Sequence, residues 1–193
     1  MMTLDEMLNQ WIPYRLQAIE TLQFAWQWVD ESDMPRQVDV LVDGKPKLRG
    51  NVAMIANPMI EVGIIHARAL LEFLGLCAIN GKLGQVRNRR PDDIAVEHFS
   101  TAEFPLSIVA PSAALFAYPG PTKDAEDALV AIFEWANKSL AHLTTGSLSG
   151  NYTDRHLDIA CRGIPVLLYN HLYAKLGKTI PLPPSAVPAA PAG

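Results

Sequence analysis

Cysteine is scarce in this sequence, with Cys77 and Cys161 the only two among 193 residues. No CxxC pair occurs, which excludes a thiolate zinc site. Both cysteines fall in apolar segments predicted to be helical, where a free cysteine usually packs as a small apolar side chain. Because disulfides persist mainly in oxidising compartments, we expect a reduced, cytoplasmic protein, with a disulfide as the less favoured alternative.

Charge is scarce as well. Charged residues make up 19% of the chain, the formal net charge is -4 and the pI is about 5.7. Such a chain has no basic field for binding nucleic acid through charge alone. The one local basic run is "RNRRP", which contains Arg87, Arg89 and Arg90. An average globular domain carries roughly 25% charged residues, so the low content is typical of a surface partly covered by a partner.

Several motifs of catalysis are missing. HExxH, a glycine-rich phosphate loop and GxSxG are all absent from the sequence. A di-metal carboxylate bundle needs Glu-x-x-His pairs on two helices, and the chain has none. Asp93, Glu97 and His98 lie close enough in sequence for a weak metal site, but a solvated helix face is the favoured interpretation. We therefore predict no metal and no cofactor.

Neither a leader nor a membrane anchor is expected. The N-terminal "MMTLDEML" lacks a basic region and an uninterrupted apolar core. Residues 52–79 are long and apolar enough to suggest a transmembrane helix. Glu61, Arg68 and Glu72 count against it, because each charge costs about 2.5 kcal/mol or more at the bilayer centre. We expect a soluble protein without a membrane partner.

Apolar residues recur at intervals of three and four, which predicts four long helices. These helices cover about 4–30, 52–79, 122–144 and 153–176. Pro13 should kink the first helix or end a first short one. Because no robust strand pattern accompanies them, the sequence predicts an all-α fold, an antiparallel bundle of four long helices.

The connecting segments are more irregular than a minimal bundle needs. Alternating valines and the Asp43-Gly44 dipeptide predict a small hairpin or an extended loop near 36–50, where Pro46 argues against a long second strand. A short extra helix, "DIAVEHF", is expected after Pro91. Residues 1–178 are interpreted as a single helical domain and 179–193 as a proline-rich C-terminal tail that does not fold alone.

The apolar segment "EVGIIHARALLEFLG" carries four ionisable side chains. A helix turns about 100° per residue, which places Asn57, Glu61, Arg68 and Glu72 in one stripe. This stripe is either a solvated edge or a polar seam inside the bundle or at a dimer interface. His66 points nearly the opposite way, and we expect a core histidine bonded to a backbone carbonyl or a neighbouring helix, with a site role as the alternative.

The third predicted helix presents a second polar group. Asn137, Lys138 and His142 lie away from its apolar face, beside Trp135. A tryptophan outside the core face suggests a second covered surface. These residues therefore face a loop, a neighbouring chain or a groove, and a plain surface histidine is the alternative.

Three blocks of the chain resemble a known group of proteins. In order they are "HARALLEFL" (66–74), "DDIAVEHF" (92–99) and "NKSLAHLT" (137–144). Together they are similar to a group of uncharacterised bacterial helical proteins that resembles the HEPN superfamily. The resemblance covers residues 52–175 and implies a helical bundle, often dimeric, of the kind found in toxin-antitoxin and defence systems.

The resemblance also implies a site. Active HEPN ribonucleases carry an arginine, four to six residues and then a histidine, which stabilise phosphate charge and transfer protons. In "NKSLAHLT" His142 fits the histidine position, whereas Asn137 or Lys138 fills the arginine position. The motif is therefore degenerate, and an inactive relative used for binding is as plausible as a nuclease.

Two functional hypotheses follow. The first is a helical interaction or structural protein that forms a homodimer or larger homo-oligomer and has a protein partner. The alternative is a HEPN-like, metal-independent ribonuclease or toxin-type protein acting on RNA through His142, Arg68 and His66. For the site we predict Arg68 and His142 as catalytic residues, with Glu72, Asn137 and Lys138 binding, in a groove between the second and third long helices.

Overall fold

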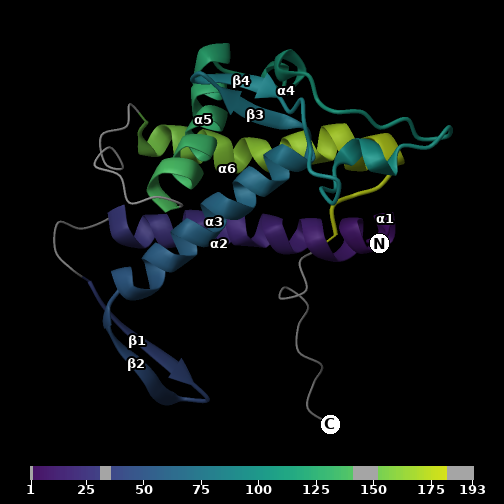
Figure 1. Cartoon of the computed structure of the whole chain (residues 1–193). Helices are drawn as coiled ribbons and strands as arrows, with labels where there is room; N and C mark the ends of the chain where they lie inside the picture. Colours follow the sequence, from purple (N-terminus) through teal and green to yellow (C-terminus); the bar gives the residue numbers. More distant parts are fainter. Residues whose placement is uncertain (1, 31–35, 141–151, 182–193) are drawn as a thin grey trace, which may run out of the picture.

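The computed structural model describes residues 2–30, 36–140 and 152–181. It is 60% helical, and its described residues also form two small antiparallel sheets of two strands each (Figure 1). The predicted all-α bundle of four long helices is therefore wrong. Helices build the body, but both hairpins are part of the fold.

The first helical segment covers the range 4–30 in three continuous parts. These are α1 (Leu4–Glu6), a π-helical turn η1 (Met7–Trp11) and α2 (Ile12–Asp30). Thr3 and Glu6 start it with a reciprocal capping box. The Glu6 N–H donates to Thr3 Oγ1 at 3.2 Å, and the Thr3 N–H donates to Glu6 Oε2 at 2.8 Å.

Pro13 removes one backbone hydrogen bond from the π-helical turn. In such a turn each carbonyl accepts a hydrogen bond from the N–H five residues later, as Met7 O does from the Ile12 N–H. The carbonyl of Leu8 would then need the N–H of Pro13, which proline lacks. The buried Tyr173 hydroxyl donates to Leu8 O instead, at 2.7 Å, so the C-terminal helical segment satisfies the carbonyl that Pro13 leaves open.

The helix α3 (Ala53–Phe73) crosses α2 at the centre of the body (Figure 1). Gly63 lies at their contact, and a methyl group added there would overlap Leu22 Cβ and lie 2.9 Å from Ala18 O. Glycine at this position therefore lets the two helices approach more closely than any other residue would.

The second predicted helix ends earlier than expected, at Phe73, and the prediction of helix to residue 79 is wrong. Gly75 follows with a φ of +88°. The next residues form a second hairpin from β3 (Leu76–Ile79) and β4 (Lys82–Gln85). Asn80-Gly81 connects the strands with φ values of +52° and +73°, which suit a type I′ turn. Because β3 continues the apolar run of α3, periodicity did not separate the two.

The first hairpin lies within the predicted range near 36–50. It consists of β1 (Gln37–Val42) and β2 (Lys45–Asn51), joined at Asp43-Gly44. Pro46 does not shorten the second strand as expected. It pairs with Leu41 beside a shift of register, and edge strands tolerate proline at such bulges. The hairpin projects from the helical body (Figure 1).

The remaining elements complete the body. In place of the predicted short helix, the described residues form a 3-10 turn, η2 (Val96–Phe99). The later helices are α4 (Pro111–Phe116), α5 (Thr122–Glu134) and α6 (Asp154–Leu168). The π-helical η3 (Trp135–Leu140) continues α5, and η4 (Tyr169–Tyr173) and η5 (Ala174–Leu176) continue α6.

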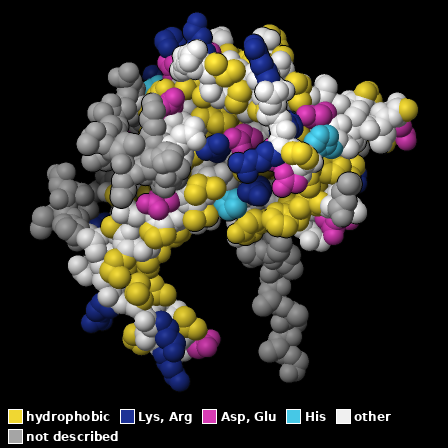
Figure 2. All heavy atoms as spheres, in the orientation of Figure 1, with side chains coloured by type: hydrophobic (Ala, Val, Ile, Leu, Met, Phe, Trp, Pro, Cys, Tyr) yellow, Lys and Arg dark blue, Asp and Glu magenta, His cyan; other side chains and the backbone are white. Residues whose placement is uncertain are grey.

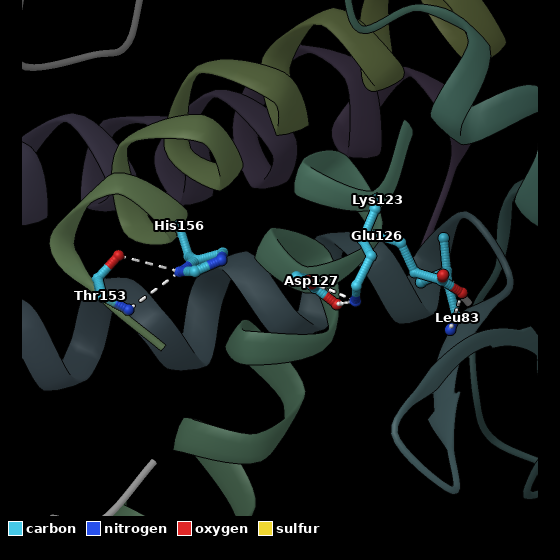
Figure 3. Close-up of polar contacts among 6 residues, drawn as sticks. All are labelled: Leu83, Lys123, Glu126, Asp127, Thr153 and His156. Carbon is cyan, nitrogen blue, oxygen red and sulfur yellow. Dashed lines mark hydrogen bonds and ion pairs between the residues drawn. The ribbon is translucent and has the colours of Figure 1, made fainter. Parts of the chain in front are cut away.

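Polar contacts fix α5 and the start of α6 (Figure 3). Glu126 of α5 accepts the backbone N–H of Leu83 in β4 through Oε1 at 3.1 Å. His156 accepts the backbone N–H of Thr153 through Nδ1 at 3.0 Å. The second hairpin is thereby tied to the third long helical segment.

Two predictions reach beyond the described residues. The third long helical segment is described to Leu140, so His142 lies outside, as does the side chain of Lys138. The tail is described only to Pro181, and Ile180 packs partly buried against the core. The interpretation as a single domain with a tail stays a prediction.

Among the described helices, α3 is long and apolar enough to cross a membrane by length and composition. The core helix of a soluble protein passes the same test. Eight of the 21 residues of α3 are buried within the body.

Two helical glycines provide a matched test of the α2–α3 contact. Gly63→Ala should destabilise the protein by about 1–3 kcal/mol, because the added methyl overpacks against Leu22. Gly163→Ala gains the same helix propensity, and no heavy atom lies within 4 Å of its added methyl. It should therefore stabilise by up to about 1 kcal/mol. Urea unfolding measures both, and equal stability of the two variants would contradict the close packing.

An arginine-lined cavity as the candidate functional site

A cavity of about 590 Å³ lies between the N-terminal helical segment, the C-terminal half of α3 and the loop 86–94. Its charged lining consists of four arginines and three carboxylates, namely Arg15, Arg68, Arg89, Arg90, Glu72, Asp92 and Asp93. Its apolar wall includes Met2, Met7, Trp11, Ile12, Phe73 and Ile94. The cavity therefore combines a guanidinium-rich interior with an apolar wall.

Two of the sequence-predicted site residues, Arg68 and Glu72, line this cavity, and a third, Asn137, contacts Arg68. Arg68 Nε donates to Glu72 Oε1 at 2.9 Å, the expected i,i+4 pair on α3. Arg68 Nη1 donates to Oδ1 of Asn137 on η3. Lys138 and His142 cannot be placed beside them, since the side chain of one and the whole of the other lie outside the described residues. Glu72 and Asn137 together hold the Arg68 guanidinium in place.

Arg89 anchors the loop 86–94 to α3. Its Nη1 donates to the Glu72 carbonyl at 3.0 Å, and its Nε donates to Glu97 Oε1 at 3.1 Å. The Nη2 atom is buried and has no acceptor among the described residues. One N–H group of this guanidinium is therefore buried without a partner among the described residues.

Arg15 reaches the cavity from α2 and meets a histidine instead of a carboxylate. Its Nη1 lies 2.8 Å from His66 Nδ1. A guanidinium can only donate, so Nδ1 must be the acceptor and His66 is neutral, with its proton on Nε2. His66 is half-buried and bonded to a neighbouring helix, as one expectation held, but its partner is a side chain and not a backbone group.

Two aromatic rings complete the surroundings of this pair. Tyr14 meets the His66 ring edge-on, with centroids 5.2 Å apart. The Arg15 guanidinium lies 5.9 Å from the Trp11 ring centroid, within range of a cation–π interaction. Both rings come from the same helical segment as Arg15, one turn or one residue away.

Arg15 is the half-buried arginine of the site that has no ion pair with a described carboxylate. Within the described ranges no carboxylate forms an ion pair with it, whereas Arg68 and Arg89 each have one. Burial lowers the pKa of Arg15, yet an arginine stays protonated in proteins. A half-buried cation without a counter-charge is costly, and an anion placed in the cavity would offset that cost.

The residues considered for a weak metal site have separate roles. Asp93 Oδ2 accepts the Arg90 N–H at 2.9 Å, and His98 Nδ1 accepts the Ala95 N–H at 3.1 Å. Glu97 pairs with Arg89. No cluster of three or more histidine, cysteine or acidic side chains suited to a metal occurs in the part of the chain that the structure describes.

Sequence reasoning missed Arg15 and Trp11 as site residues. Their spacing of four on one helix was the available signal, because it places both side chains on one face. That signal does not reveal the partner on α3. The "RNRRP" run was noted as basic, and two of its arginines prove to line the cavity.

The His66–Arg15 contact should make stability depend on pH. Burial, followed by the Arg15 charge, lowers the pKa of His66 below its ordinary value. As the pH falls, the histidine of the unfolded chain is therefore protonated before His66 of the folded chain. The stability that neutral His66 contributes is complete above about pH 6.5 and is lost as the pH falls towards the lowered pKa. His66→Gln keeps an acceptor without titrating, and its stability should change less over this window.

Urea unfolding at about pH 5, 6 and 7 measures this difference. His171 also has a pKa lowered by burial, so His171→Gln serves as the control for a general histidine effect. An equal change of the unfolding free energy with pH in wild type and His66→Gln would contradict the assigned contact.

No protein family, curated protein or solved structure was found to match this chain. The resemblance to the HEPN superfamily therefore stays an expectation drawn from the three sequence blocks.

Proposed function

We propose that the protein is a binding protein that takes a phosphate-bearing small molecule of the nucleotide class in the arginine-lined cavity. The observation that carries this proposal is Arg15, a half-buried guanidinium whose hydrogen-bond partner is neutral His66. An anion placed in the cavity would supply the counter-charge that the described residues do not.

Arginine suits this ligand for a geometric reason. Its planar fork of N–H donors matches the oxygens of a phosphate group. Arg15 has donors beyond the Nη1 that meets His66, and Arg90 is exposed at the cavity with no ion pair to a described residue. Arg68 is occupied by Glu72 and Asn137, so its role is to position the wall and not to contact the ligand first.

The rest of the cavity suits a planar ring attached to the phosphate. Trp11 is 42% exposed at the cavity, where its ring can stack on a flat ligand. Asp92 and Asp93 supply acceptors for exocyclic amino groups. The volume of about 590 Å³ falls within the range of roughly 300–1,000 Å³ typical of small-molecule sites.

The lining favours binding over catalysis. Among the described residues that line the cavity there is no serine, threonine, cysteine, histidine, lysine or tyrosine. Nucleophilic and general acid–base chemistry would rest on carboxylates alone, and Glu72 is engaged with Arg68. We therefore place ligand binding ahead of catalysis at this cavity.

Metal-independent RNA cleavage is kept as a second candidate because of Arg68. This residue lines the cavity and bonds Asn137, which precedes His142 by five residues. In this proposal the RNA backbone takes the place of the nucleotide phosphate, and His142 transfers the proton.

Arg15→Gln tests the binding proposal. AMP at 100 times its Kd should stabilise the folded protein by about 2.7 kcal/mol. This stabilisation corresponds to a rise in the melting temperature of the wild type of roughly 5–10 °C. The Arg15→Gln variant should lose most of this shift. Arg162→Gln is the control, since Arg162 is exposed on α6 and paired with Asp158. An unchanged shift in Arg15→Gln, or none in the wild type, would contradict the proposal.

The two candidates separate in a second measurement. Wild-type protein in EDTA should leave a mixed set of RNAs intact while it still binds AMP. Cleavage that is lost in both Arg68→Ala and His142→Ala would instead support the ribonuclease. Adenosine, which lacks the phosphate, should give no shift in melting temperature in either case.

A further inference from the structure

The hairpin β1–β2 has one largely apolar face and one face of mixed character. Residues paired across antiparallel strands point to the same side, and neighbours along a strand alternate. The pairs Val38↔Gly50 and Val40↔Leu48 therefore define one face, which is apolar. Asp39 and Arg49 lie on the other face, where they form an ion pair at 2.7 Å; Leu41, which is paired with Pro46 and 58% exposed, lies on the side of Asp39.

The apolar face of the hairpin is largely open. Leu48 is 37% exposed and Val42, nearer the tip, 48%. Figure 2 shows hydrophobic and basic side chains on the surface of the projecting hairpin. A two-stranded hairpin is marginal in water unless its apolar face is covered, and the described residues leave Leu48 and Val42 of this arm exposed.

This face continues onto α3. A methyl group added at Gly50 would meet Met54 Sδ at 2.6 Å, so the hairpin face and the first turn of α3 adjoin. Met54, Val62 and Ile65 are 46–56% exposed and lie within one stripe of the helix at about 100° per residue. The stripe borders an apolar groove of about 390 Å³ between α2 and α3.

Charge distinguishes the two halves of this surface. Lys45 and Lys47 are exposed towards the tip of the hairpin, whereas Glu61 is exposed on α3, next to Val62. The hairpin joins α3 at its N-terminal end and extends away from the helical body (Figure 1). Its lysines are thus held away from the Glu61 of the same chain, although their charges are complementary.

We infer that a second copy of this chain covers the surface, with the hairpin of each protomer laid across the α3 stripe and groove of the other. A two-fold axis makes both contacts at once and buries both apolar surfaces of both chains. The lysines of each hairpin then lie near Glu61 of the facing copy. This interface is separate from the nucleotide cavity and goes beyond the proposed binding function.

Sedimentation of the full chain at about 20 μM, well above the Kd range of a specific dimer, tests the inference. The wild type should have twice the 21.2 kDa mass of one chain. Leu48→Glu and Val62→Glu should each be monomeric with unchanged circular dichroism, because both side chains are exposed in one chain. Phe116→Glu is the matched control: Phe116 is 92% exposed on α4, and this variant should stay dimeric.

A charge exchange tests the arrangement itself. The double change Lys45→Glu and Lys47→Glu should weaken the dimer at least tenfold, and so should Glu61→Lys. Combining all three should restore it. A monomeric wild type, a dimer that survives both Leu48→Glu and Val62→Glu, or a combined variant no tighter than its parents would each overturn the inference.

Discussion

The close approach of α2 and α3 at Gly63 is the constraint on which the remaining structure depends. It holds two long helices nearly in backbone contact, with Leu22 and Ala18 against the glycine. Residues further along both helices are thereby set facing each other, and Arg15 meets His66 across the gap. The charged end of the same helix pair opens into the cavity, so packing at one glycine determines the geometry of the site.

The electrostatics of the cavity follow from which arginines have partners. Glu72 and Asn137 hold Arg68, while Glu97 and the Glu72 carbonyl hold Arg89. Among the described residues, Arg15 has a hydrogen-bond acceptor in His66 but no negatively charged partner. Tyr14 connects this site to the apolar groove, since it contacts His66 and also lines the groove between α2 and α3. Tyr14 therefore lies between the two proposed surfaces.

The sequence allowed the long helical segments to be located because their apolar periods are long and regular, as between Leu8 and Trp26 on the first. It did not reveal the hairpin after Phe73, because an apolar strand and the apolar end of a helix have similar sequences. Helix geometry did place Arg68 and Glu72 on one side. The role of Arg15 was not predicted, because no local pattern identifies a partner 51 residues away.

A crystal structure of the protein grown with AMP tests the central claim most directly. The account predicts phosphate oxygens within hydrogen-bond distance of the Arg15 guanidinium, while Arg15 Nη1 still donates to His66 Nδ1. AMP bound away from the cavity, or Arg15 paired with a carboxylate of its own chain, would contradict it.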